Sequence, residues 1–160
     1  MSSYRVRAAT LDDADALVAH RIAMFTDMAV PLDHAALEAA FRKWIAETMP
    51  NGSFRAWLVE ADGGAIVAGG GITVIPWPPG PHYLHDRLAF VYNVYTDPSH
   101  RRRGLARMIM DAIHEWCLDN GIGTIGLNTS AEARTLYESM GYRVTPNPMM
   151  FCAVARPRTK

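Results

Sequence analysis

Residues 91–106 read VYNVYTDPSHRRRGLA. β-Branched and aromatic residues run up to Thr96, and they predict the end of a buried strand. Asp97-Pro98 then predicts a turn. Beyond Gly104 an apolar stripe at helical spacing predicts a helix that stops at Gly121. Because three arginines stand between the turn and the helix, this stretch predicts a strand-to-helix junction with a local positive charge.

This junction has the features of a phosphate or pyrophosphate site. The first N–H groups of a helix have no partner within the helix and carry a partial positive charge. Gly104 leaves this backbone uncovered, Ala106 is nearly as small, and Arg101–Arg103 add forked donors. The chain has neither a GxxxxGK[ST] loop nor a GxGxxG motif after its first strand, which argues against a P-loop or a Rossmann site. The alternative is a basic loop that happens to precede a glycine.

Around the junction the sequence predicts a mixture of strands and helices. We expect strands over Tyr4–Ala9, Ser53–Glu60, Ala65–Ile75, Leu88–Tyr95, Ile122–Leu127 and Tyr142–Ala153. We expect helices over 10–28, 33–45, Arg103–Asn120 and Ala131–Met140, the first with a capping box of Thr10 and Asp13 and the second capped by Asp33. Residues 88–127 then form a strand, a crossover helix and a parallel strand. The pattern favours one α/β domain over residues 1–160, with a frayed tail at 156–160.

The composition is that of an ordinary globular domain. Hydrophobic residues make up 49% and charged residues 20% of the 160 residues, and the formal net charge is zero. No overall field recruits nucleic acid or a membrane surface. We find neither a secretory signal nor an apolar run approaching the ~20 residues of a membrane span. Cys117 and Cys152 lack metal-ligand spacing, so we expect reduced core thiols, no metal and a cytoplasmic protein.

Two motifs carry a resemblance to a known family. Residues 101–106, RRRGLA, resemble the Q/R-x-x-G-x-G/A signature of the GNAT N-acetyltransferase superfamily. Residues 133–142, ARTLYESMGY, resemble its second signature, A-x-x-L-Y-E-x-x-G-F/Y. The order of strands and helices over essentially the whole chain agrees. The resemblance implies a single-domain α/β (α+β) GNAT-like fold, with a mixed central sheet of about six or seven strands, splayed parallel strands and four flanking helices.

The resemblance also implies acetyl-CoA as the co-substrate. Its diphosphate is expected on the backbone of Arg101, Arg102, Arg103, Gly104, Leu105 and Ala106. Its pantetheine arm is expected to pair like an extra strand with Val94, Tyr95 and Thr96. The helix start at Ser130 and Ala133 is expected to approach the same arm, although Ser130 stands where many family members carry Asn.

By the same resemblance an amine attacks the thioester directly in a ternary complex. A backbone N–H near Val94 meets the oxyanion, and Tyr137 occupies the position of the usual proton donor. The alternative for Tyr137 is a core aromatic residue. The strand 88–96 lacks the family's frequent carboxylate base, so the base is a water, His85 or Asp86, or the amine arrives neutral.

The acceptor is expected over the first two helices and the loop before the strand 88–96. The candidate residues are Arg21, Phe25, Trp77, His85 and Asn93. An arginine with aromatic residues suits a small-molecule primary amine that carries a carboxylate, such as an amino acid or a peptide terminus. The alternative for Arg21 is a surface salt bridge with Asp15 or Asp27. A protein-modifying acetyltransferase or toxin, a non-catalytic acyl-CoA sensor, and a homodimer stay open.

Overall fold

The computed structural model describes residues 3–81, 83–147 and 149–152. Its elements are β1 (Tyr4–Ala8), α1 (Ala14–Asp27), α2 (His34–Thr48), β2 (Phe54–Ala61), β3 (Ile66–Pro76), β4 (Arg87–Thr96), α3 (Leu105–Asp119), β5 (Ile125–Leu127) and α4 (Arg134–Ser139). Short 3-10 turns lie at Leu11–Asp13 and Pro98–His100. The chain forms two compact units, divided between Asn128 and Thr129.

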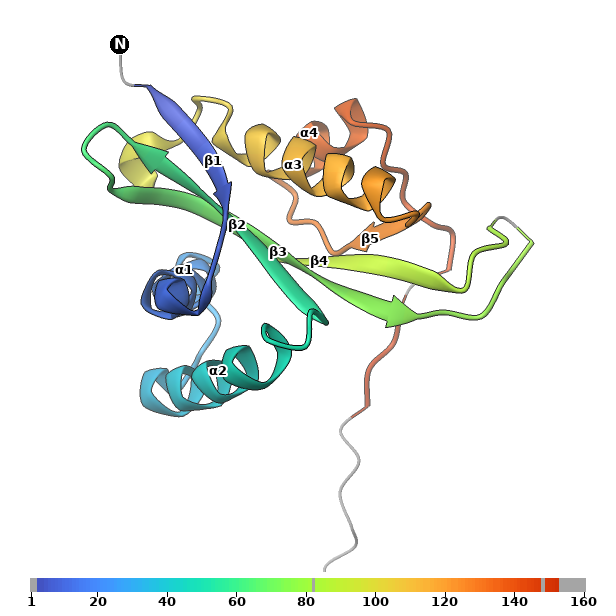
Figure 1. Ribbon diagram of the computed structural model, residues 1–160, viewed down its shortest axis with the longest axis horizontal. Coiled ribbons are helices and arrows are strands. Elements are labelled where there is room, and N and C mark those ends of the chain that lie inside the picture. The colour runs from blue at the N-terminus through green and yellow to red at the C-terminus, as the bar shows by residue number, and fades with distance from the viewer. Residues whose placement is uncertain (1–2, 82, 148, 153–160) are drawn as a thin grey trace, which may run out of the picture. The chain divides into compact units, whose positions relative to one another are not determined.

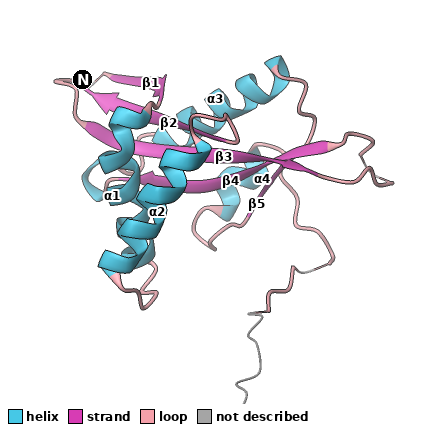
Figure 2. Ribbon diagram, turned by 60° about the horizontal axis from the view of Figure 1, so that its bottom comes forward, coloured by secondary structure: helices cyan, strands magenta, loops and turns pink. Residues whose placement is uncertain are grey.

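The first unit contains a five-stranded sheet in the order β1-β2-β3-β4-β5. Neighbouring strands are antiparallel, except that β4 and β5 run parallel. α3 makes the crossover between these two strands (Figure 1), which confirms the predicted strand–helix–strand unit. α1 and α2 lie side by side on one face of the sheet, and α3 lies on the other (Figures 1 and 2). The mixed α/β fold is therefore confirmed, with five strands in the described residues instead of six or seven.

The predictions fail mainly near the C-terminus. The strand expected over Tyr142–Ala153 does not form in its described part, where Pro146 has no N–H to donate to a ladder. Cys152, expected in the core, is exposed, whereas Cys117 is buried as expected. The tail 156–160 lies outside the described residues.

β5 begins at Ile125 instead of Ile122. The N–H of Ile122 donates to the carbonyl of Cys117 at 2.8 Å and closes the end of α3 around Gly121, whose φ is +67°. This residue is therefore part of the helix cap and not of the strand. Among the described residues, no helix has both the length and the apolarity needed to cross a bilayer.

The predicted helix caps are present. The Thr10 N–H donates to Asp13 Oδ2 at 2.8 Å, and Asp33 Oδ1 accepts the Ala36 N–H at 3.0 Å. Asp13 also pairs with Arg7 at 2.8 Å, and the Arg7 guanidinium lowers the pKa of the Asp13 carboxyl to about 2. The first helix is thereby tied to β1 by an ion pair as well as by packing.

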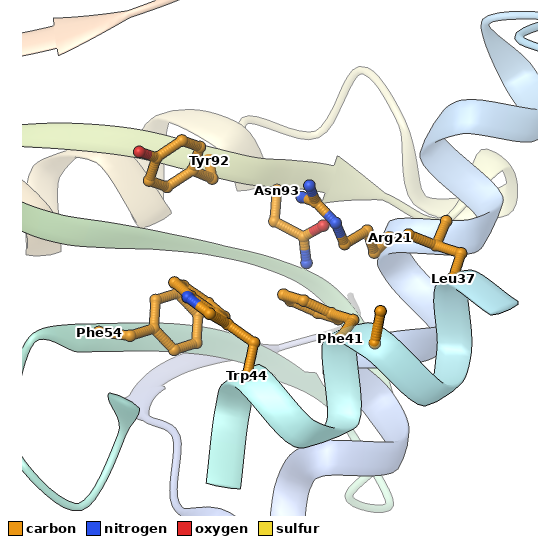
Figure 3. Close-up of a pocket in the computed structure, with 8 residues that line it drawn as sticks. Arg21, Leu37, Phe41, Trp44, Phe54, Tyr92 and Asn93 are labelled. Atoms are coloured by element: carbon orange, nitrogen blue, oxygen red, sulfur yellow. The ribbon is translucent and has the colours of Figure 1, made fainter. Parts of the chain in front are cut away.

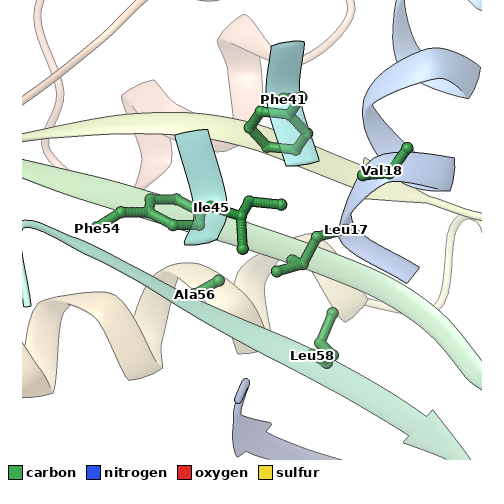
Figure 4. Close-up of a cluster of buried hydrophobic side chains, with 7 residues drawn as sticks. All are labelled: Leu17, Val18, Phe41, Ile45, Phe54, Ala56 and Leu58. Atoms are coloured by element: carbon green, nitrogen blue, oxygen red, sulfur yellow. The ribbon is translucent and has the colours of Figure 1, made fainter. Parts of the chain in front are cut away.

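The core occupies both faces of the sheet. On the α1/α2 face, a buried cluster joins the two helices to β2 (Figure 4): Leu17, Val18, Phe41, Ile45, Phe54, Ala56 and Leu58. On the other face, α3 buries Leu105, Ile109, Met110, Ile113 and Cys117. These residues include most of the apolar stripe seen in the sequence, and at ~25 cal/mol per Å² of apolar surface they hold α3 on the sheet.

Three consecutive glycines in β3 leave room for large side chains of β2 on one face and for α3 on the other. A Cβ on Gly69 would lie 2.8 Å from Leu58 Cδ2, and one on Gly71 would lie 2.6 Å from Phe54 Cε2. On the α3 face, a Cβ on Gly70 would lie 2.7 Å from Ile109 Cγ2 and 3.2 Å from Val94 Cγ2. Contacts shorter than 3.0 Å require the neighbours to move, so these positions have no space for a side chain.

We predict that Gly70→Ala lowers the free energy of unfolding by about 1–3 kcal/mol, because the added methyl overlaps Ile109 and Val94. Urea titration followed by circular dichroism measures the change. Gly126→Ala in β5 is the matched control, since its Cβ would meet Phe90 at an ordinary 3.4 Å. Equal stability of the two variants would contradict the close-packing argument.

Candidate functional site

The site is organised by a β-bulge in β4. Gly69 pairs with Tyr95 and Gly71 with Tyr92, so Asn93 and Val94 together lie opposite the single residue Gly70. Asn93 adopts a φ of +60°, a left-handed conformation that asparagine tolerates better than most residues. Such a bulge leaves one residue outside the ladder and redirects the side chains around it.

The parallel pairing of β4 with β5 ends just before the bulge. The last paired residues are Val91 and Leu127. Beyond this point β4 continues to Thr96 and stays paired with β3 on its other edge. β5 itself ends at Leu127, so the edge of β4 at Val94, Tyr95 and Thr96 has no β5 partner in the ladder, and the splaying of the two strands stays a prediction.

The loop between β4 and α3 presents backbone amides. Arg102 and Gly104 both have left-handed backbones, with φ of +63° and +81°. The first helical hydrogen bond runs from the Met108 N–H to the Gly104 carbonyl, so the amides of Leu105 and Ala106 precede it. Turns of this kind form concave anion sites. A Cβ on Gly104 would meet nothing within 4 Å, so the space beside this backbone is open and fits a phosphate.

Gly104 thus has a conformational role that sequence reasoning missed. A left-handed backbone strains any side chain larger than glycine, whatever space surrounds it. Substitution at Gly104 therefore changes the loop as well as adding bulk, and a test of the anion site needs a different position.

The three arginines of the loop differ in their partners. Arg101 forms an ion pair with Asp27, which raises the pKa of Arg101, and donates from Nε to the Thr96 carbonyl at 3.0 Å. Arg103 donates to the Tyr4 hydroxyl at 3.1 Å. Arg102 is exposed and makes no hydrogen bond or ion pair with another described residue. Of the three guanidinium groups, Arg102 is therefore the one without a hydrogen bond or an ion pair among the described residues, and Arg103 has no acidic partner there.

A pocket of about 350 Å³ opens between α1, α2 and the sheet (Figure 3). The residues that line it are Arg21, Leu37, Ala40, Phe41, Trp44, Phe54, Tyr92 and Asn93. Two of the residues proposed for the acceptor, Arg21 and Asn93, are thus brought together although they lie far apart in the sequence. The α2 residues and Tyr92 were missed as site residues, because the apolar spacing of α2 indicates only a buried helix face.

Arg21 is the one charged residue among the described residues of the pocket wall. Its guanidinium carbon lies 5.1 Å from the centre of the Phe25 ring and 4.8 Å from that of Phe41. Burial lowers the pKa of Arg21. Asp15 pairs with Arg42 and Asp27 with Arg101, and no ion pair among the described residues includes Arg21. The salt-bridge alternative for Arg21 is therefore wrong.

Asn93 lines the pocket and also carries a buried acceptor without a hydrogen-bond partner among the described residues. Its side chain is 4% exposed, and its Nδ2 donates to the Leu17 carbonyl at 3.2 Å. Its Oδ1 is buried without a hydrogen-bond partner among the described residues. A buried carbonyl oxygen without a donor costs about 1–3 kcal/mol, so this atom favours a ligand that supplies an N–H or O–H group.

The other acceptor candidates lie elsewhere. Phe25 contacts Arg21 but does not line the pocket. Trp77 lies at the start of the β3–β4 loop, where its Nε1 donates to the Tyr83 hydroxyl at 2.6 Å. His85 lies against Gly123, on which a Cβ would be 2.5 Å from His85 Nε2. Neither Trp77 nor His85 lines the pocket.

The remaining candidates belong to the second unit. The Ala133 N–H donates to Ser130 Oγ at 3.3 Å, so Ser130 caps the turn before α4. Tyr137 is 7% exposed, and its ring lies 5.7 Å from that of Tyr142 in a T-shaped contact. Burial raises the pKa of the Tyr137 phenol, so this group keeps its proton at neutral pH. In the described part of the chain, His, Cys, Asp and Glu residues do not gather into any metal-binding group of three.

Comparison with solved structures shows the same fold in other proteins. A GCN5-related N-acetyltransferase from Ralstonia eutropha JMP134 is 32% identical, with a TM-score of 0.84 over 94% of this chain and 99% of that one. A predicted acetyltransferase from Clostridium acetobutylicum, solved with acetyl-CoA, is 22% identical, with a TM-score of 0.84 over 94% of this chain and 96% of that one. The second similarity concerns the fold alone.

Sequence comparison agrees. Human N-acetyltransferase 8 is 25% identical over 103 residues, which are 62% of this chain and 43% of the human protein, so this chain matches less than half of that relative's length. The model of the acetyltransferase (GNAT) family matches residues 17–142, which include the bulge, the amide loop and the residues lining the pocket. With most of its length matched, this chain belongs to the GNAT acetyltransferase family.

Proposed function

We propose that this protein transfers an acetyl group from acetyl-CoA to the primary amine of a small molecule, by direct attack within a ternary complex. One observation carries the proposal: the bulge at Asn93–Val94 adjoins the open edge of β4, and Asn93 also lines the apolar pocket. A donor lying along the edge and an acceptor held in the pocket then meet at the bulge. The pocket volume of about 350 Å³ suits a small acceptor better than a protein surface.

The donor side is formed by backbone groups. The amides of Leu105 and Ala106 and the side chain of Arg102 hold the diphosphate. The main chain of Val94, Tyr95 and Thr96 pairs with the pantetheine arm along the edge that β5 leaves open. Acetyl-CoA supplies an acyl group activated as a thioester. In this arrangement the charged contacts with the diphosphate lie at the loop, and the thioester lies at the bulge, where the acetyl group is transferred.

The bulge supplies oxyanion stabilisation. Because one residue of a bulge stays outside the ladder, a backbone N–H of Asn93–Val94 is available to the tetrahedral intermediate. A fixed backbone donor costs no reorganisation during the reaction, and losing such a donor typically costs about 100–1,000-fold in rate.

The acceptor amine must lose a proton before it attacks. None of the described residues lining the pocket is a carboxylate, and Arg21 places a positive charge there. A like charge disfavours the ammonium form and lowers the pKa of the bound amine. We infer that the amine binds neutral and gives up its second proton to water, so that neither His85 nor Asp86 is needed as a base.

We predict that Ala106→Glu weakens CoA binding by at least about 100-fold, because a carboxylate beside the amide loop repels the diphosphate. The fold tolerates the change, since an acidic residue in the first turn of a helix is favourable. Isothermal titration with CoA measures the affinity, and Ala106→Ser is the small, neutral control. If the folded Ala106→Glu protein binds CoA with wild-type affinity, the diphosphate does not bind at this loop.

The proposed activity is tested by free-thiol release from acetyl-CoA with a panel of neutral, anionic and cationic primary amines. We expect at least one amine to release thiol well above the rate of thioester hydrolysis. If the protein binds acetyl-CoA but no amine in the panel increases thiol release, the proposed enzymatic activity is wrong and a non-catalytic acyl-CoA sensor is favoured.

We predict that Tyr137→Phe lowers kcat by roughly 100-fold, at the lower end of the usual effect of removing a general acid. Phenylalanine keeps the ring contact with Tyr142, so fold and CoA affinity are expected to stay unchanged. The assay is kcat at saturating substrates across pH. Tyr142→Phe, which removes the hydroxyl of the contacting ring, is the control. If kcat of Tyr137→Phe is within twofold of wild type, Tyr137 serves only in core packing and the proton comes from solvent.

A further inference from the structure

We infer that the pocket selects a free α-amino acid with an apolar side chain, whose carboxylate binds Arg21 and whose amine donates to Asn93 Oδ1. The inference rests on the proposed acetyl transfer and assigns the acceptor of that reaction. It depends on three features of the pocket: an uncompensated cation, an orphaned acceptor and an apolar wall.

The cation requires an anion from the ligand. Arg21 is partly buried between two phenylalanine rings, and Asp15 and Asp27 are engaged by other arginines. Burial of a charge without a counter-ion is unfavourable, so an incoming carboxylate recovers part of that cost. A guanidinium fork matches a carboxylate with two parallel hydrogen bonds.

The orphaned acceptor requires an N–H donor from the ligand. The bond from Asn93 Nδ2 to the Leu17 carbonyl fixes the amide, and Oδ1 is left buried beside the pocket without a donor among the described residues. Asn93 also belongs to the bulge where transfer takes place. A group that donates to Oδ1 therefore lies at the reaction centre, which makes it the amine that is acetylated.

The apolar wall of the pocket determines which kind of ligand side chain can bind. Leu37, Ala40, Phe41, Trp44 and Phe54 provide apolar surface, and the wall has no charged group besides Arg21 and, besides Asn93, only the indole N–H of Trp44 and the hydroxyl of Tyr92 as polar side-chain groups. A charged side chain would lose its hydration there without compensation. A pocket of about 350 Å³ is at the small end for ligand sites, which suits a single amino acid.

The same features exclude two other acceptor classes. A peptide amino terminus has an amide in place of the α-carboxylate, so Arg21 would find no anion beside the amine. A polyamine brings a second ammonium group toward the Arg21 guanidinium, and like charges at close range repel. The notable property of the site is therefore the adjacency of amine and carboxylate in one ligand.

The test compares L-phenylalanine and L-leucine with L-phenylalaninamide, phenethylamine and spermidine as acceptors. We expect kcat/KM for L-phenylalanine to exceed that for the amide and for phenethylamine by about 100-fold, the usual effect of losing a charge-assisted bidentate contact. Binding is measured separately, by isothermal titration of L-phenylalanine into the protein with CoA bound, a mixture in which no acetyl transfer takes place.

Variants assign the contacts. Arg21→Met keeps a linear apolar stem beside the rings and is expected to abolish the preference for L-phenylalanine over phenethylamine. Asn93→Gly keeps the left-handed backbone and is expected to lower kcat/KM about tenfold for every amine, with CoA affinity unchanged. Circular dichroism verifies that each variant is folded.

A second pair of variants avoids the core. Ala40 is exposed on α2 and lines the pocket, whereas Ala39 beside it is exposed and does not. Ala40→Glu supplies a carboxylate to Arg21 and is expected to weaken L-phenylalanine binding at least tenfold, while Ala39→Glu leaves it unchanged. Glutamate suits a helix, so both variants are expected to fold.

The outcomes separate the two proposals. If phenethylamine or spermidine is acetylated as well as L-phenylalanine, or Arg21→Met affects every acceptor equally, the amino-acid assignment is wrong and the acetyltransferase stands. If no amine causes thiol release, the proposed acetyltransferase activity is wrong. In that case, L-phenylalanine binding that is lost in Arg21→Met would still support the assignment of the pocket. If L-phenylalanine does not bind at all, the assignment of the pocket is wrong as well.

Discussion

Two residues of β4 lie opposite one residue of β3, and Gly70 is the residue that makes room for them. The constraint is steric on both sides of the sheet. Ile109 of α3 and Val94 of the bulge already occupy the space that a side chain at Gly70 would fill. Because α3 must pack this closely, its first turn is held directly beyond the end of β4, where the amide loop forms. The bulge in β4 and the helix α3 therefore meet at this one close contact.

The bulge also separates two environments along a single strand. Before it, β4 pairs with β5 through Val91, and the backbone is fully used by the sheet. After it, the edge up to Thr96 lacks that partner, and Arg101 donates a hydrogen bond to the Thr96 carbonyl where the strand ends. Asn93 stands at the boundary, with its donor committed to Leu17 and its acceptor left unused. An unused buried acceptor is unfavourable for folding, and it is suited to a site that must hold a hydrogen-bond donor.

The charged residues also fall into two groups, those that bind other parts of the fold and those left for a ligand. The chain has a formal net charge of zero, so its anion sites depend on local placement. Asp27 engages Arg101 and Tyr4 engages Arg103, and these contacts tie the amide loop to α1 and β1. Among the described residues Arg21 has no ion-pair partner, and its guanidinium lies over two aromatic rings. Cations that have partners within the fold hold the amide loop in place, whereas a cation without an acidic partner in an apolar pocket is available for a ligand.

The amino-acid sequence by itself determined the fold class, the helix caps and the strand-to-helix junction, because these depend on local patterns: apolar spacing along α3, Asp33 before α2, and Gly104 after three arginines. It also placed Arg21 and Asn93 among the acceptor candidates by residue type. Tertiary structure alone decided which candidates meet. Arg21 and Asn93 share a pocket with residues of α2, whereas Trp77 and His85 do not reach it, and Arg101 is engaged by Asp27. These contacts join residues that are distant in the chain, so they cannot be predicted from the spacing of residues along the sequence. The bulge belongs to the same class, since it arises from the register of β3 against β4, and the sequence of neither strand specifies that register alone.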